Sequence, residues 1–129
     1  VLGTLHTHRA AQTVDRIINS FPADKQAHIR TMISTSLRGV ISQQLLPTIH
    51  RPGRAAALET MINTSAVSNL IRQGKLDQLE TAIQSGGNVG MKSMDSALME
   101  LVEKGWVSGE EAYLQANNKA QFEKVKETE

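Results

Sequence analysis

Two strand-like runs separated by a short turn restrict the fold of this chain more than any other feature. Residues 40–49 (VISQQLLPTI) and 55–62 (AAALETMI) are predominantly apolar, and the turn between them, 50–54 (HRPGR), contains the proline and glycine that interrupt strands. A hairpin is the simplest connection between two such strands. We therefore expect a β-hairpin between residues 40 and 62.

One strand and two helices are expected before the hairpin. Residues 1–7 (VLGTLHT) are apolar and small, with β-branched members, and predict a short, largely buried strand. An amphipathic helix should follow and end at 20–22 (SFP), because the residue before a proline is pushed out of the α region. The next helix is expected to have Asp24 as its N-cap and Gly39 as its stop. The apolar stripe of the first helix comprises Ala10, Val14, Ile17, Ile18 and Phe21.

Only short helices are expected from residue 63 onward. Gly74, the SGG stretch at 85–87 and Gly105 end the first three of them, and Ser108 begins a capping box for a fourth. The stretch from residue 116 is polar, with little besides Phe122 to bury, and predicts either a frayed helix or disorder. The first half is thus mixed α and β, and the second half is helical.

Composition excludes several classes of function. The 14 basic and 13 acidic residues are well mixed, and four aromatic side chains are too few for a base-stacking platform, so nucleic-acid binding is disfavoured. The absence of cysteine rules out disulfides and thiolate zinc sites. No apolar run of about 18 residues and no leader sequence are present, which predicts a cytoplasmic protein. Because the sequence starts at Val1 within a strand-like run, we expect it to be a piece of a longer protein.

Two histidines two positions apart, His6 and His8, raise the possibility of a metal site. In a strand, alternate side chains share one face, so both imidazoles would point at one ion. This arrangement would suit a small metal-dependent hydrolase. A hydrolytic zinc site usually has three protein ligands, however, and the remaining histidines fall on a helix (His28) and in a turn (His50). Two ordinary polar residues at a strand end are the simpler interpretation, and we expect no metal.

Motifs for nucleophilic or phosphate chemistry are missing. The sequence has no G-x-S-x-G elbow, and residues 85–92 (SGGNVGMK) only superficially resemble a phosphate-binding loop. These glycines are more typical of a helix-to-helix turn. The amphipathic helix at 66–72 (AVSNLIR) is explained by a buried stripe and a solvated face. It is alternatively an interaction module that binds a partner through Leu70 and Ile71.

Several segments, taken in order, are similar to one family. The run GTLHT, followed by AAQTVDR and FPAD, resembles the histidine box of the type II/type IV secretion ATPases. The later segments resemble the twitching-motility pilus retraction subgroup, and the similarity extends from residue 1 to about 116. These later segments are SLRGVISQQLLP (36–47), GRAAALETM (53–61), AVSNLIRQGK (66–75), AIQSGGNVGMKSMDSAL (82–98) and LVEKGWVSGEEA (101–112).

The resemblance implies a fold and an activity. Members are hexameric ATPase motors whose RecA-like domain carries Walker A, an acidic box, Walker B and then the histidine box. Here only the last is present, which implies an α/β fold with a closing part of a RecA-like P-loop ATPase core at 1–62, a helical C-terminal subdomain at 63–115 and a polar tail at 116–129. The intact protein would use ATP and Mg²⁺, whereas this fragment alone is predicted to be inactive.

The resemblance also implies partners and site residues. It implies a homo-hexamer that meets an inner-membrane pilus platform protein and lies in the cytoplasm, peripheral to the inner membrane. His6 matches the box histidine that lies near the nucleotide γ-phosphate, while His8 and Arg9 stand where the family usually has asparagine and often serine. The four-cysteine zinc motif of assembly ATPases is absent, which favours the retraction branch. The retraction signature helix A-I-R-N-L-I-R corresponds to Ala66, Val67, Ser68, Asn69, Leu70, Ile71 and Arg72, with Ser68 replacing an arginine.

Overall fold

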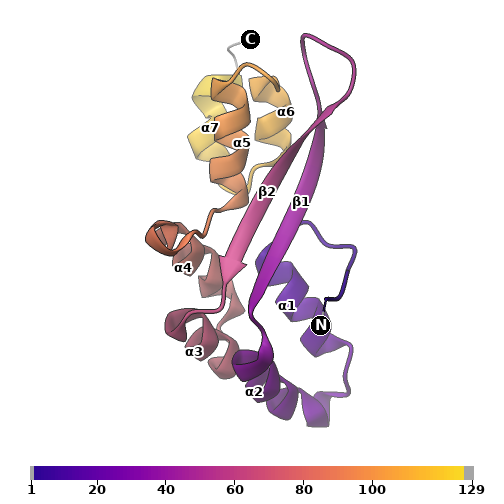
Figure 1. Cartoon of the computed structure of the whole chain (residues 1–129), viewed down its shortest axis with the longest axis vertical. Helices are drawn as coiled ribbons and strands as arrows, with labels where there is room; N and C mark the ends of the chain where they lie inside the picture. The colour runs from indigo at the N-terminus through magenta and orange to yellow at the C-terminus, as the bar shows by residue number, and fades with distance from the viewer. Residues whose placement is uncertain (1, 127–129) are drawn as a thin grey trace.

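A computed structural model describes residues 2–126, and the expectations for Val1 and for 127–129 lie outside them. A long two-stranded hairpin runs through the molecule, and helices pack against it at both ends (Figure 1). The protein is therefore mixed α/β, as the sequence predicts. The elements are α1 (Ala10–Asn19), α2 (Gln26–Ser36), β1 (Gly39–Pro47), β2 (Arg54–Ile62), α3 (Ser65–Gln73), α4 (Leu79–Ser85), α5 (Met94–Glu103), α6 (Gly109–Gln115) and α7 (Lys119–Lys126), with short 3₁₀ turns at Ala23–Lys25, Leu76–Gln78 and Gly87–Val89.

The predicted hairpin is confirmed. Strands β1 and β2 pair antiparallel from Gly39 opposite Ile62 to Pro47 opposite Arg54. Burial alternates strictly along β1, because successive side chains of a strand point to opposite faces. One face of the hairpin is covered by helices, and the other carries exposed apolar side chains such as Ile41, which is 72% exposed.

Two separate apolar cores lie against the covered face of the hairpin. The tip cluster joins Leu46, Ala55 and Ala57 at the turn end of the hairpin to α5, α6 and α7. The base cluster joins Val40 and Met61 at the other end to α1, α3 and α4. Each strand thus contributes to both clusters, and the hairpin connects two helical groups (Figure 1).

Most of the predicted helix boundaries are confirmed by capping contacts. The Ser108 hydroxyl accepts the backbone N–H of Glu111 at the start of α6, as the capping box requires. Gly74 has a left-handed conformation (φ 74°) after α3, and Gly105 has one (φ 75°) after α5. The glycines after Ser85 form a turn between α4 and α5, as expected.

The strand predicted at residues 1–7 is wrong. Residues 2–7 form no strand, and the chain from 2 to 6 is exposed. A strand requires a hydrogen-bonded neighbour, and β1 and β2 are the only strands within the described part of the chain. The segment is instead attached to α1, because the Thr7 and Thr13 hydroxyls lie 2.6 Å apart and the His8 N–H donates to the Gln12 side chain.

Three local predictions about α1 and α2 are also wrong. Asp24 lies inside a 3₁₀ turn that begins directly after Pro22, so it does not cap α2. Gly39 does not stop the helix, which ends at Ser36, because the Asn63 side chain satisfies carbonyl groups at the end of α2. Phe21, expected in the buried stripe of α1, is 40% exposed because α1 ends two residues before it.

The polar stretch from residue 116 contains a helix. Phe122 on α7 is completely buried in the tip cluster, and Val125 packs against the same cluster. Helix α7 lies against α6, and the carbonyl of Val125 comes so close to Gly109 that a β-carbon there would collide with it. Of the two expectations for this stretch, the helix is the one observed over Lys119–Lys126.

Candidate functional site

A group of polar side chains separates the two apolar cores. On the covered face of the hairpin, Ser42 and Gln44 of β1 lie beside Glu59 of β2, between the apolar residues at either end. Glu59 is only 2% exposed. We call these three residues the polar middle of the hairpin. Burial of a carboxylate is costly unless hydrogen bonds compensate for the lost water, so the partners of Glu59 are informative.

The Glu59 carboxylate joins the beginnings of two helices. One oxygen accepts the backbone N–H of Ala10, the first residue of α1, at 2.6 Å. The other accepts the N–H of Met94, the first residue of α5, at 3.1 Å. Both N–H groups would lack an intrahelical partner, and each helix N-terminus favours a negative charge. Glu59 therefore fixes both helices to the hairpin, and it replaces the side-chain cap that Arg9 does not supply to α1.

A second buried carboxylate, Asp95, connects the N-terminal segment to the C-terminal helices. Its Oδ1 lies 3.4 Å from Nη1 of Arg9, and the two oxygens accept the backbone N–H groups of Asn117 and Asn118 at 2.8 Å. Arg9 also donates to the carbonyl of Gln115 at 2.7 Å. Arg9 and Asp95 together hold the chain just before α1 against the connection between α6 and α7.

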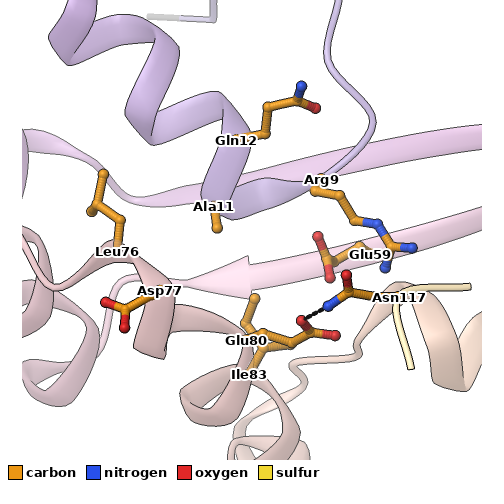
Figure 2. Close-up of a pocket in the computed structure, with 9 residues that line it drawn as sticks. All are labelled: Arg9, Ala11, Gln12, Glu59, Leu76, Asp77, Glu80, Ile83 and Asn117. Carbon is orange, nitrogen blue, oxygen red and sulfur yellow. Dashed lines mark hydrogen bonds between the residues drawn. The ribbon is translucent and has the colours of Figure 1, made fainter. Parts of the chain in front are cut away.

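A cavity of about 320 Å³ opens beside these contacts. Figure 2 shows Arg9, Glu59, Glu80 and Asn117 along it, with the Asn117 amide donating to Glu80. Burial raises the pKa of Glu80, and the negative charges of Asp95 and Glu59 raise it further, whereas Arg9 and the Asn117 hydrogen bond lower it. Glu80 therefore holds its proton more tightly than an exposed glutamate does.

His6, the predicted nucleotide sensor, lies on an exposed segment three residues before Arg9. Its side chain makes no hydrogen bond to any of residues 2–126, and it does not line the cavity. His8 is exposed as well, and the described residues contain no group of three or more histidine, cysteine, aspartate or glutamate side chains placed to hold a metal ion. The role of His6 stays a prediction.

The predicted retraction helix coincides with α3, and its polar side faces α2. Ser68, which replaces the signature arginine, donates its hydroxyl to the carbonyl of Ser34 at 2.7 Å. Arg72 donates to the Asn69 side chain at 3.1 Å, and a polar hollow of about 310 Å³ lies between these residues and Arg38.

The opposite side of α3 carries Val67 and Ile71 into the base cluster, so Ile71 is unavailable to a partner while Leu70 is partly buried. The structure does not bring α3 and His6 together in one site.

The charged residues in and beside the cavity were missed from sequence, although one of them gave a signal. Glu59 occupies an inward-facing position of β2 that otherwise reads Ala55, Ala57 and Met61, and a charge at such a position indicates a buried polar contact. Asp95 gave no such signal, because an aspartate in the first turn of a helix is ordinarily explained by the helix dipole. Arg9 stood out only as a departure from the family pattern.

Comparisons with known proteins show which proteins this chain is similar to. No family model matches the chain. The type IV pilus retraction ATPase PilT of Pseudomonas aeruginosa is 51% identical over 87% of the chain and 32% of its own length, and a twitching motility protein of Neisseria gonorrhoeae is 47% identical over 92% and 32%. A crystal structure of the pilus retraction motor PilT with bound ADP covers 95% of this chain and 34% of its own, at 35% identity and a TM-score of 0.80.

In fold and in sequence, the chain resembles the C-terminal part of the type II/type IV secretion ATPases, the class that its motifs indicated, and its fold is mixed α/β as expected. Within that class, the chain is homologous to the C-terminal region of the type IV pilus retraction ATPases, so the resemblance inferred from its motifs is confirmed. It spans about a third of the length of the curated relatives it matches. Among the described residues, no helix is long and apolar enough to cross a bilayer.

Proposed function

We propose that the chain is the C-terminal region of an ATPase motor that powers type IV pilus retraction and couples ATP hydrolysis to pilus disassembly. One observation carries the proposal: 51% identity to a retraction ATPase extends over 87% of the chain. The matched crystal structure of a retraction motor was obtained with ADP, which supports ATP as the nucleotide. Mg²⁺ would accompany it, as in other phosphoryl-transfer enzymes of the P-loop class.

His6 would act as the nucleotide sensor of this motor. An imidazole N–H can donate to a phosphate oxygen, and the exposed segment of His6 leaves its side chain accessible. Arg9 and Asp95 then provide a physical connection from this segment to α5 and to the connection before α7. A displacement of the His6 segment on hydrolysis would be transmitted through that ion pair to the C-terminal helices. Residues 66–72 of helix α3 would serve retraction itself.

The organisation implied by the family completes the proposal. Residues 1–62 would close the RecA-like core, 63–115 would form the helical subdomain, and 116–129 would follow as its tail. Six copies of the intact protein would assemble and act on an inner-membrane platform protein from the cytoplasmic side. By itself the chain would not hydrolyse ATP, because its sequence contains neither the phosphate-binding lysine loop nor the Walker B carboxylate.

A chimera tests the proposal directly. The matching third of Pseudomonas aeruginosa PilT is replaced by this chain in a strain that lacks the native gene, and twitching and ATPase activity are measured. Both should be restored. A chimera that assembles and hydrolyses ATP but supports no twitching would contradict retraction as the function.

Single histidine variants of the chimera separate the sensor role from a general effect. His6→Ala should lower the ATPase rate at least about tenfold, since it removes a donor to the reacting phosphate. His28→Ala, an exposed histidine on α2, is the matched control and should leave the rate unchanged. Equal rates for the two variants would remove His6 from the mechanism.

Phosphate release by the isolated 129-residue chain should not exceed that of a no-protein control.

A further inference from the structure

Beside the connecting loop of the hairpin, two cations lie close to the ring of an exposed tryptophan. Trp106, in the turn between α5 and α6, is 44% exposed. The guanidinium carbon of Arg51 lies 5.3 Å from the centre of its ring and the ammonium nitrogen of Lys104 lies 5.2 Å from it. Cations at such distances are attracted by the negative face of the ring. Together with Arg54 and the exposed Ile49, these residues form what we call the tip patch.

The backbone holds the tip patch in place. The N–H of Ile49 donates to the carbonyl of Trp106 at 3.0 Å, which joins the hairpin loop to the turn between α5 and α6. Within the loop, the N–H of Thr48 donates to the carbonyl of Gly53 at 3.2 Å. These contacts join the loop that carries Arg51 to the turn that carries Trp106.

The charge and shape of the tip patch fit one class of partner. Residues 48–54 include two arginines and no acidic residue, and Lys104 adds a third positive charge. The loop between β1 and β2 lies at one end of the long axis of the molecule (Figure 1). A loop in this place suits a flat surface better than an extended peptide, which needs a groove. Tryptophan and apolar side chains flanked by arginine and lysine are typical of segments that rest in the headgroup region of a bilayer.

We infer that the tip patch binds the surface of an anionic phospholipid bilayer, with Trp106 and Ile49 inserted at headgroup level and Arg51, Arg54 and Lys104 paired with lipid phosphates. This contact requires no nucleotide and does not depend on the proposed ATPase function. It would set the orientation of the molecule, with the hairpin tip toward the membrane and the base cluster away from it.

Fluorescence tests this inference without a label, because Trp106 is the only tryptophan of the chain. The 129-residue chain is titrated with vesicles of phosphatidylglycerol mixed with phosphatidylcholine, and separately with vesicles of phosphatidylcholine alone. We expect the emission of Trp106 to shift to the blue with the anionic vesicles only, and the shift to weaken as salt is added. No shift with the anionic vesicles would overturn the inference.

Charge-matched variants show whether the tip patch itself is responsible. Replacement of Arg51, Arg54 and Lys104 by glutamine should weaken co-sedimentation with anionic vesicles by at least about tenfold. The control variant replaces Arg16, Lys25 and Lys75, which are exposed and outside the tip patch, by glutamine. It should bind anionic vesicles within about twofold of the parent. An equal loss of vesicle binding in both variants would show that only the net charge of the protein attracts it, and would refute binding through the tip patch. A blue shift with polyglutamate but none with vesicles would assign the patch to an acidic protein instead.

Discussion

Arg9 and Asp95, 86 positions apart in the sequence, meet at 3.4 Å on the boundary between two apolar cores. Asp95 is nearly inaccessible, whereas the Arg9 side chain retains about a fifth of its exposure (21%). Their contributions to stability should therefore be unequal. Asp95 has two backbone partners besides Arg9, and Arg9 has the Gln115 carbonyl besides Asp95.

Asp95→Ala should lower the free energy of unfolding by about 2 to 4 kcal/mol, because it leaves the N–H groups of Asn117 and Asn118 without their acceptor. Arg9→Met should cost less than about 1 kcal/mol, since a long, partly exposed ion pair contributes little. Urea denaturation of both variants and of the double variant measures the coupling. A larger loss for Arg9→Met than for Asp95→Ala would contradict this assignment, and the exposed Asp15→Ala serves as the control.

Glu59→Gln should lower the free energy of unfolding by about 1.5 to 3 kcal/mol. The amide keeps one acceptor oxygen, but its NH₂ group would face a helix N–H, either that of Ala10 or that of Met94. The exposed Glu103→Gln gives the same change of charge elsewhere and should stay within about 0.5 kcal/mol of the parent. Hydrogen exchange should show faster opening at the first turns of α1 and α5 in the Glu59 variant alone.

Glu80 should make the protein less stable as the pH rises. Its pKa in the folded state lies above the ordinary value of 4.5, so the folded state binds the proton more tightly than the unfolded state does. Stability is then lost as the pH rises from below that ordinary value through the raised pKa, and it is regained on acidification. Glu80→Gln removes this loss and keeps an acceptor for Asn117. Urea denaturation midpoints measured from acid to neutral pH should show the variant to be more stable than the parent at neutral pH and equal to it in acid. A stability difference between the two proteins that grows in acid would contradict a raised pKa of Glu80.

Phe122→Ala should lower the free energy of unfolding by about 3 to 5 kcal/mol, because it opens a cavity in the tip cluster. The neighbouring exposed Gln121→Ala should change it by less than about 0.5 kcal/mol. Limited proteolysis should cut the Phe122 variant within 116–126 and spare both the parent and the control. Rapid cleavage of the parent at these positions would show that α7 is not part of the folded protein.

The sequence predicted the hairpin, α3 and the helices after it because strong local signals coincide there. Alternating burial, left-handed glycines and a serine cap each act over a few residues. The failures involve long-range contacts. The end of α2 depends on Asn63, 27 positions after Ser36, and a strand at 2–7 would need a neighbouring strand. Likewise, no local pattern indicated that Asp95 accepts N–H groups more than 20 positions away.

The candidate site was less accessible to sequence reasoning than the fold. Family resemblance pointed to His6 and to α3, whereas the structure draws attention to Arg9, Glu59 and Asp95 between the two cores. These residues acquire their contacts only through the hairpin, which brings the beginnings of α1 and α5 to one carboxylate. Of the three, only Glu59 broke a local pattern, namely the inward apolar series of β2.

The polar middle of the hairpin has a consequence for the cooperativity of unfolding. The tip and base clusters are held together by backbone pairing and by a few buried hydrogen bonds, with no continuous apolar contact between them. Hydrogen bonds to Glu59 and Asp95 can open without exposing much apolar surface, so each end of the hairpin can unfold locally as a unit of its own. Native-state exchange should therefore divide the amides into two groups of distinct opening free energy, one at each end of the hairpin.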